Sequence, residues 1–185
     1  VIGTGSSGIQ AIPLIAEQAT KLTVFQRTAN YSIPARNGQI DPKRQAKKDA
    51  DIQAYREAAR WSIAGVPEPA NEKGAMQVAA EERQAKYEEI WSKGELVATN
   101  TAYNDLLVNP ISNETISSFV REKVRAKVND PEVAELLSPK HFPLSTKRLC
   151  LDTNYYETYN LPHVRLVDLR QSPITTITEK GIDTS

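Results

Sequence analysis

The sequence predicts an α/β fold, and two observations lead to this prediction. The chain opens on the apolar end of a strand, a glycine-rich turn and a helical stripe, and a second apolar strand follows at residues 22–26. A long block of charged, alanine-rich residues comes next, before alternating apolar residues return near the C-terminus. This order is typical of a Rossmann-type nucleotide-binding domain with an inserted helical subdomain. We expect residues 1–38 to form the first part of that domain and residues 39–138 to form the helical subdomain. Residues 139–185 are expected to return to the nucleotide-binding domain and to include an active-site loop.

The glycine-rich turn has the spacing of a dinucleotide-binding loop. Gly3, Gly5 and Gly8 form a G-x-G-x-x-G pattern between strand and helix. The first glycine permits a tight turn, the second lets backbone approach a pyrophosphate, and the third lets helix and strand pack closely. The amides and dipole of the helix start would face the phosphates, with the hydroxyls of Ser6 and Ser7 as further donors. The alternative, a buried turn without a ligand, is disfavoured because strand, turn, helix and strand occur in the required order.

The end of the second strand indicates which dinucleotide would bind. An NAD site usually places Asp or Glu about twenty residues further on, where it bonds the ribose hydroxyls. Here the residues are Gln26, Arg27 and Thr28, without an acid. A guanidinium can hold a 2′-phosphate with two charged hydrogen bonds, and the Thr28 hydroxyl can donate another. We therefore expect an NADP(H)-binding domain, the alternative for Arg27 being a solvated surface arginine.

The composition disfavours several other classes of partner. The 185 residues include 23 basic and 23 acidic side chains, so charge favours neither a nucleic acid nor an anionic membrane. No apolar run reaches transmembrane length, no signal peptide is recognisable, and we expect no metal site. The single cysteine, Cys150, excludes an internal disulfide and fits a reducing cytoplasm. We expect it to be a buried apolar side chain rather than a reactive thiol.

The charged block is expected to be helical. Gly94 is expected to end its second helix, Pro110 its third, and Asp130 with Pro131 to begin its fifth. The less polar residues of each helix are expected to pack. The expected helices are residues 44–63 (with Ala46, Ala50, Ala58 and Trp61 less polar), 76–91 (with Ala80, Tyr87, Ile90 and Trp91 packing), 95–108, a fourth marked by Ile116, Phe119, Val120 and Val124, and the short fifth.

The last part of the chain is expected to return to the sheet. Residues 163–170 alternate in polarity and indicate a strand, and residues 174–178 indicate a strand that enters a tight turn at Lys180 and Gly181. Between them and the helical block lies the basic pair Lys147 and Arg148, which in isolation is most simply a surface pair in a loop. His141 is expected to be structural or exposed rather than a general base.

Three stretches together resemble one family. Residues 1–10 (Val-Ile-Gly-Thr-Gly-Ser-Ser-Gly-Ile-Gln), 25–31 (Phe-Gln-Arg-Thr-Ala-Asn-Tyr) and 145–148 (Ser-Thr-Lys-Arg) are similar to the Baeyer–Villiger monooxygenases, in particular the cyclohexanone and cyclopentanone monooxygenase branch. The resemblance covers nearly the whole chain, including the helical insertion. It implies an enzyme that uses FAD, NADPH and O2 to convert cyclic ketones to lactones through a peroxyflavin.

The resemblance also implies roles for individual residues. Arg148 would be the catalytic arginine facing flavin and nicotinamide, where a permanent cation stabilises the negative charge that develops on oxygen. Arg27, Thr28 and Lys147 would hold the 2′-phosphate of NADP. The residues expected along the pyrophosphate are Gly3, Thr4, Gly5, Ser6, Ser7, Gly8, Ile9 and Gln10.

The sequence departs from the family in what it lacks. The glycine motif for FAD and the family's His-and-Trp fingerprint are absent, and the chain begins at Val1 on the end of a strand. We therefore expect a fragment of a longer enzyme, inactive by itself, whose remaining regions complete the FAD and substrate sites. Two alternatives stay open. One is an N- or S-oxidising flavoprotein monooxygenase that also uses NADPH, and the other is a non-catalytic NADP(H)-sensing module.

Overall fold

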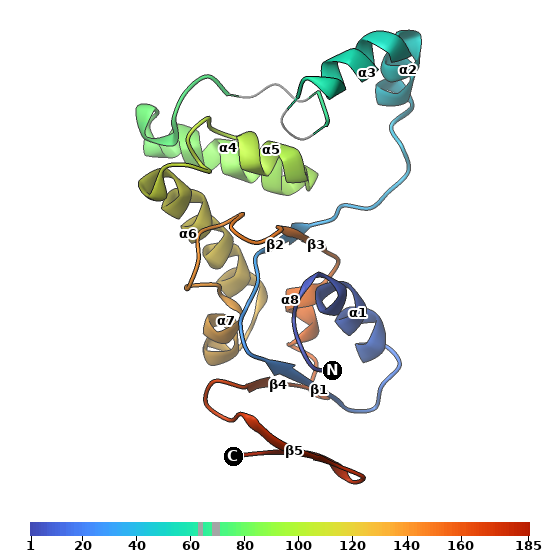
Figure 1. Cartoon of the computed structure of the whole chain (residues 1–185), viewed down its shortest axis with the longest axis vertical. Helices are drawn as coiled ribbons and strands as arrows, with labels where there is room; N and C mark the ends of the chain where they lie inside the picture. Colours follow the sequence, from blue (N-terminus) through green and yellow to red (C-terminus); the bar gives the residue numbers. More distant parts are fainter. Residues whose placement is uncertain (63–64, 68–70) are drawn as a thin grey trace.

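The computed structural model describes residues 1–62, 65–67 and 71–185, which form a mixed α/β fold (Figure 1). Its strands are short, and its helices lie mainly in the middle of the chain. The strands are β1 (Leu22–Gln26), β2 (Ser32–Pro34), β3 (Cys150–Asp152), β4 (Val164–Asp168), β5 (Ile174–Thr178) and β6 (Gly181–Thr184). The helices are α1 (Ser6–Ala16), α2 (Pro42–Ala50), α3 (Ile52–Arg60), α4 (Ala80–Lys93), α5 (Leu96–Thr101), α6 (Pro110–Lys127), α7 (Pro131–Leu137) and α8 (Tyr155–Thr158).

The predicted order of strand, glycine turn, helix and strand is confirmed. Ile2 forms a parallel bridge with Phe25, and the Gly3 amide donates to the Phe25 carbonyl at 2.8 Å. On its other edge β1 pairs in parallel with β4, in the register Leu22 to Val164. The expectation that residues 163–170 return to the sheet is therefore confirmed. Helix α1 then packs through a buried apolar stripe that includes Ile9 and Ile12.

The described strands form two further pairs. Strands β2 and β3 pair in parallel, with Ser32 opposite Cys150 and Pro34 opposite Asp152. This pair was not predicted. The strand predicted over residues 174–178 is β5, and a tight turn follows it as predicted. The antiparallel pairing of β5 with β6 into a hairpin was not predicted. The hairpin projects at the C-terminal end of the molecule (Figure 1).

The single helix expected over residues 44–63 is wrong. Two helices, α2 and α3, meet at Asp51, whose backbone leaves helical geometry at φ −145° and ψ 76°. Its carboxylate accepts a hydrogen bond from the Ala54 amide at 2.9 Å and so caps the start of α3. The four less polar positions do not pack: Trp61 is 80% exposed, and Ala46, Ala50 and Ala58 are also exposed. Ile63 lies outside the described residues.

The boundaries of the next helices also differ from expectation. Residues 75–77 form a separate 3-10 turn, in which Gln77 Oε1 accepts from the Gly74 amide, so α4 begins at Ala80 rather than at residue 76. Gly94 ends α4 in the left-handed conformation at φ +69°, as predicted. Tyr87, Ile90 and Trp91 are buried as expected, whereas Ala80 is exposed.

Proline 110 begins a helix instead of ending one. The expected helix over residues 95–108 is confined to α5, and the chain then turns until Asn109. The Asn109 side chain accepts from the Ile111 and Ser112 amides and caps α6, with Pro110 in the first turn. The fourth helix is confirmed, because the predicted apolar stripe of α6 is buried. The fifth is also confirmed, since the Asp130 side chain accepts from the amides of Glu132 and Val133.

The core consists of two clusters, and α6 contributes to both. One cluster joins strand β2 to α4 and α6 and includes Leu144 and Leu149. The other joins α1, β1 and α8, and contains Tyr155, Tyr156 and Tyr159. The first cluster therefore combines residues from all three expected domain ranges, and the division at residues 38 and 138 stays a prediction. None of the helices in the described part of the chain combines the length and apolarity needed to cross a membrane; the cytoplasmic location stays a prediction.

Candidate cofactor site

Each glycine of the loop has a distinct geometric role. Gly3 has φ +97°, in the region that side chains rarely adopt, and forms the turn that leaves the strand. A Cβ on Gly8 would lie 2.6 Å from the Gly3 carbonyl oxygen, so only glycine lets α1 start this close to the strand. A Cβ on Gly5 would meet no atom within 4 Å, which leaves open space beside this part of the backbone.

The first amides of α1 have no backbone partner within the described part of the chain. The first hydrogen bond of the helix runs from the Ile9 amide to the Gly5 carbonyl at 2.9 Å, so the amides of Ser6, Ser7 and Gly8 precede the helical ladder. Gly5 caps the helix without a side chain, and the first turn contains no acid. An eleven-residue helix with this start presents a positive end to an anion.

A cavity of about 390 Å³ lies beside the loop. It brings together three stretches that are far apart in the sequence: the glycine loop, the end of β1 and the loop before β3. Six of the predicted residues line it, namely Gly3, Thr4, Gly5, Arg27, Thr28 and Lys147. The other lining residues, which the sequence did not single out, are Ile2, Phe25, Asn30 and Leu169. The lining includes two cationic side chains and no acid.

The remaining residues predicted at the pyrophosphate do not line this cavity. Ser6, Ser7 and Gln10 are exposed on the first turns of α1, and Gly8 packs against Gly3. Ile9 is fully buried in the core, so its side chain faces away from the open end of the helix.

Thr4 and Gln26 form a buried link under the loop. The Thr4 hydroxyl donates to Gln26 Oε1 at 3.1 Å, and the Thr28 carbonyl lies at 3.2 Å as a second acceptor. Gln26 Nε2 donates to the Leu136 carbonyl at 2.7 Å. Gln26 therefore connects the loop to α7, a role that sequence reasoning missed. The available signal was a polar residue at the end of an otherwise apolar strand.

Two cationic side chains, Arg27 and Lys147, line the cavity at the carboxyl end of β1, and Arg148 follows Lys147 in the sequence. Arg27, Lys147 and Arg148 are exposed, and no carboxylate in the described part of the chain forms an ion pair with them. Lys147 Nζ lies 4.6 Å from the centre of the Phe142 ring. A further arginine, Arg170, was missed: its Nε donates to the Arg27 carbonyl at 2.9 Å, and its Nη1 contacts His141 Nε2. His141 is exposed, as expected.

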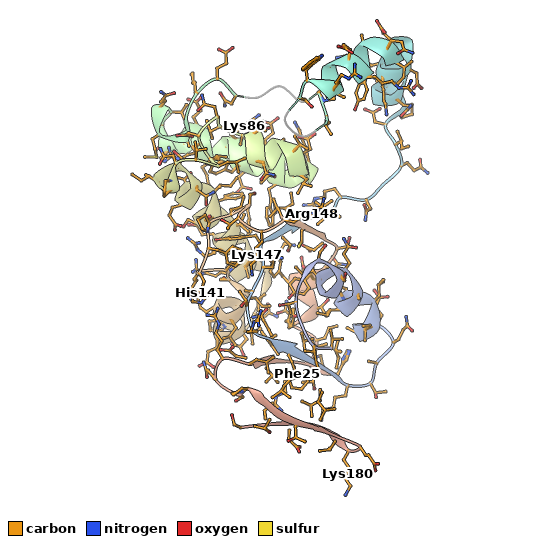
Figure 2. The ribbon with its side chains drawn as sticks, viewed as in Figure 1. Phe25, Lys86, His141, Lys147, Arg148 and Lys180 are labelled. Carbon is orange, nitrogen blue, oxygen red and sulfur yellow. The ribbon has the colours of Figure 1, made fainter. Side chains whose placement is uncertain are left out.

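Arg148 lies apart from the cavity. It immediately follows Lys147 on the loop that leads into β3, and it is not among the cavity-lining residues. Figure 2 shows both cations on this loop, with Arg148 close to β2 and β3. The structure thus brings Arg27, Thr28 and Lys147 together in one cavity, and Arg148 does not line it.

Buried polar groups support the site without facing it. Asp152 Oδ2 accepts from the Ser32 hydroxyl at 2.7 Å, and burial raises the pKa of this carboxyl. Cys150 is buried as expected, burial raises its pKa, and its Sγ lies 3.2 Å from Asn30 Nδ2. A buried thiol with a raised pKa is a poor nucleophile. The Ser32–Asp152 hydrogen bond joins β2 to β3.

Comparisons with known proteins agree on one class. The chain is 38% identical to the 2-oxo-Delta(3)-4,5,5-trimethylcyclopentenylacetyl-CoA monooxygenase of Pseudomonas putida, over 100% of this chain and 34% of that protein. It is 36% identical to the cyclopentanone 1,2-monooxygenase of a Comamonas species, over 100% and 34%. A third relative, the phenazine N-monooxygenase PhzNO1 of Lysobacter antibioticus, is 37% identical over 98% and 34%. No model of a known protein family matches the chain.

A solved structure gives the same answer. The oxidised steroid monooxygenase bound to NADP superposes with a TM-score of 0.92 and 50% identity, covering 99% of this chain and 35% of that one. The fold and the loop thus define a segment homologous to monooxygenases. Within that class, the resemblance to the Baeyer–Villiger monooxygenases is confirmed. The chain spans about a third of the length of the curated relatives it matches.

Proposed function

We propose that the whole protein is an NADPH- and FAD-dependent Baeyer–Villiger monooxygenase that inserts one atom of O2 into cyclic ketones to give lactones. This chain would contribute its Rossmann-type NADP-binding domain, with residues 39–138 as the helical insertion. The observation that carries the proposal is the cavity where the glycine loop meets Arg27, Thr28 and Lys147. The similarity to enzymes named for cyclopentanone oxygenation supports the substrate class.

The residues present fit a dinucleotide phosphate. The backbone at Gly5 has open space beside it, and the amides at the start of α1 precede the helical ladder. Both features suit a pyrophosphate that approaches the main chain closely. We assign this contact to Gly3, residues 5–8 and Gln10. Thr4 and Ile9 support the loop from beneath, because the Thr4 hydroxyl is hydrogen bonded inside and Ile9 is in the core.

The cation pair in the cavity fits the extra phosphate of NADP. Arg27 can form a bidentate contact, Lys147 can supply a point charge, and Thr28 can donate from its hydroxyl. The absence of an acid from the cavity lining means that nothing there repels a dianion. When bound, NADPH would supply the hydride and FAD, held by the rest of the protein, would supply the oxygen chemistry.

Arg148 is the residue we assign to the reaction itself. It is exposed and carries a cationic guanidinium. Placed beside the ketone, it would stabilise the negative charge that develops on oxygen when the carbonyl is attacked. Arg148 does not line the cavity assigned to the phosphate, which supports a catalytic role for Arg148 and a phosphate-binding role for Lys147.

The reaction is tested in the full-length protein with NADPH, air and cyclohexanone, by mass spectrometry for caprolactone. We expect lactone that depends on NADPH. Oxidation of NADPH without lactone would contradict the ketone assignment, and a protein without bound flavin that leaves NADPH unchanged would favour the non-catalytic sensor.

A second candidate is N-oxidation, because one relative of similar identity is named as a phenazine N-monooxygenase. The same assay with phenazine in place of cyclohexanone separates the two. N-oxide without lactone would favour this candidate, and lactone without N-oxide would favour the first.

A further inference from the structure

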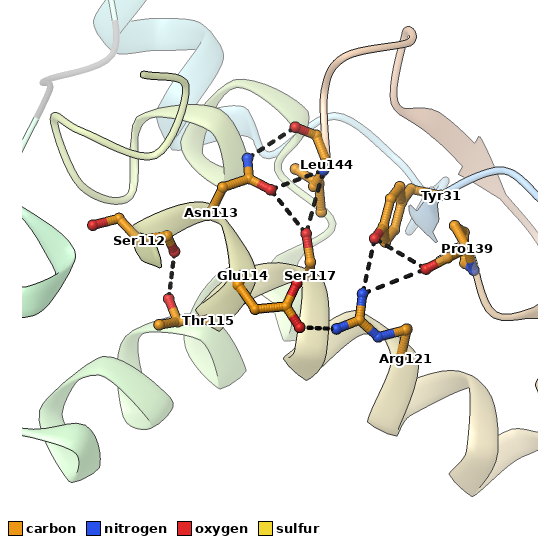
Figure 3. A network of polar contacts seen from close by, with 9 residues as sticks. All are labelled: Tyr31, Ser112, Asn113, Glu114, Thr115, Ser117, Arg121, Pro139 and Leu144. Atoms are coloured by element: carbon orange, nitrogen blue, oxygen red, sulfur yellow. Dashed lines mark hydrogen bonds and ion pairs between the residues drawn. The ribbon is translucent and has the colours of Figure 1, made fainter. Parts of the chain in front are cut away.

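Helix α6 holds the backbone of Leu144 mainly through the side chain of Asn113 (Figure 3). Asn113 is only 5% exposed. Its Oδ1 accepts from the Leu144 amide at 2.9 Å, and its Nδ2 donates to the Leu144 carbonyl at 3.0 Å. Asn113 therefore pairs with both polar groups of this residue, as a neighbouring strand would.

The amide of Asn113 has a fixed orientation. Nδ2 also donates to the Leu106 carbonyl at 2.8 Å, and Oδ1 also accepts from the Ser117 hydroxyl at 2.9 Å. The Ser117 oxygen in turn accepts from the Leu144 amide at 3.3 Å. Each polar atom of the Asn113 side chain has two partners. A flipped amide would turn its N–H groups toward the Leu144 N–H and its oxygen toward two carbonyl oxygens. Buried and fully satisfied networks of this kind allow one arrangement.

The clamped residue begins the segment that carries the two cations. Leu144 and Leu149 are 2% and 4% exposed and belong to the same core cluster. Between them, Lys147 and Arg148 are exposed. Only four residues separate the two anchors, so the direction in which the cations project depends on how the anchors are held.

Other contacts shape the same turn. Ser145 has φ +69°, an unusual conformation for a residue with a side chain, and its hydroxyl donates to Asn100 Oδ1. The Thr146 amide donates to the Pro143 carbonyl at 3.2 Å. Helix α6 also reaches Pro139 upstream, because Arg121 Nη1 lies 3.4 Å from its carbonyl oxygen (Figure 3). Among these, Asn113 alone contacts both backbone groups of the first anchor.

We propose that Asn113 is a positioning residue for the cofactor site: by clamping Leu144 it directs Lys147 toward the 2′-phosphate of NADPH. This inference rests on the proposed function, because it assigns Lys147 to that phosphate. Asn113 acts through the loop and touches no ligand itself. It makes the helical part of the chain a determinant of cofactor selectivity.

The test uses the full-length protein with Asn113→Ala and the control Ser112→Ala. Ser112 is the neighbouring residue on α6 and is fully buried, but its hydroxyl donates to Asp105 and not to the loop. Dissociation constants for NADPH and NADH are measured by titration, together with unfolding in urea. We expect Asn113→Ala to raise the dissociation constant for NADPH by about tenfold, the effect of weakening one charged hydrogen bond. The dissociation constant for NADH should change by less than about twofold.

The control and a double variant decide between positioning and general destabilisation. Ser112→Ala should lower stability while leaving the ratio of NADPH to NADH affinity unchanged. In a Lys147→Ala background, Asn113→Ala should not change that ratio further, because the contact it directs is already absent. If Asn113→Ala lowers the ratio of NADPH to NADH affinity equally with Lys147 present and with Lys147 replaced by alanine, the proposal is overturned.

The outcomes also separate this inference from the proposed function. If Lys147→Ala leaves the ratio unchanged, the phosphate assignment itself fails. If Lys147→Ala lowers the ratio and Asn113→Ala does not, only the positioning role fails. Should Asn113→Ala not fold, Ser117→Ala removes the hydroxyl that orients the Asn113 amide, and we expect a smaller drop in the same ratio; an unchanged ratio would again count against the proposal.

Discussion

Gly8 lies directly against the carbonyl oxygen of Gly3, so close that a Cβ on Gly8 would sit 2.6 Å from that atom. Three residues earlier, Gly5 has open space where its Cβ would be. Gly5 and Gly8 thus meet different physical requirements within one motif. Gly8 is required by the fold itself, whereas Gly5 leaves room for something outside the chain.

Substitution by alanine should separate these two roles. Gly8→Ala forces the helix start away from the strand and should destabilise the protein by about 1–3 kcal/mol, as overpacking does. Gly5→Ala introduces no clash and has an ordinary φ of −79°, so its stability should change by no more than about 0.5 kcal/mol. Its methyl group should nevertheless weaken NADPH binding. Urea unfolding and NADPH titration measure both effects, and equal stability losses would contradict this account.

Local sequence was sufficient for the part of the site that depends on local geometry. The glycine spacing predicted the loop, and the sequence around Asp130 predicted a cap, because both depend on a few consecutive residues. The end of β1 predicted Arg27 for the same reason, whereas Lys147 followed from the resemblance to a known family. The helix break at Asp51 was missed because an aspartate inside a helical pattern can cap a new helix as well as continue the old one.

Tertiary pairing accounts for most of what was missed. Strand β3 has only three residues and exists because it pairs with β2, which lies more than a hundred positions earlier in the chain. Arg170 follows β4, which lies beside β1. The Nε of Arg170 can therefore donate to the carbonyl of Arg27. The clamp on Leu144 likewise depends on α6 crossing a distant loop. No pattern in nearby residues indicates such contacts.

The two adjacent cations should have separable effects in the full-length protein. Arg148→Ala should leave reduction of the flavin by NADPH intact but lower the rate of lactone formation by about 10²–10³, the cost of losing one stabiliser of developing charge. Lys147→Ala should instead raise the KM for NADPH and leave the rate at saturation nearly unchanged. Stopped-flow flavin absorbance and product analysis measure the two steps. Undiminished oxygenation by Arg148→Ala would falsify its catalytic role.

The stability of the helical part should depend on pH through Tyr87. Its hydroxyl lies 2.7 Å from Thr115 Oγ1, and burial raises its pKa from 10.0 to about 12. Because the folded pKa lies above the unfolded one, the contribution to stability is complete below pH 10 and is lost as pH rises through 12. Tyr87→Phe should remove this part of the loss. Urea unfolding from pH 9 to 12 checks it, and an equally steep decline in the variant would refute the assignment.

We propose that the cavity at the end of β1 recognises the 2′-phosphate of NADP. The most direct measurement is calorimetric titration of the full-length protein with NADPH and NADH, using Arg27→Ala and the control Arg165→Ala, an exposed arginine on β4 that does not line the cavity. Arg27→Ala should weaken the binding of NADPH by about ten- to a hundredfold, the effect of losing a charged hydrogen-bond partner, and should leave the binding of NADH nearly unchanged. Arg165→Ala should leave the binding of both dinucleotides nearly unchanged. Equal weakening of both dinucleotides by Arg27→Ala would contradict the claim.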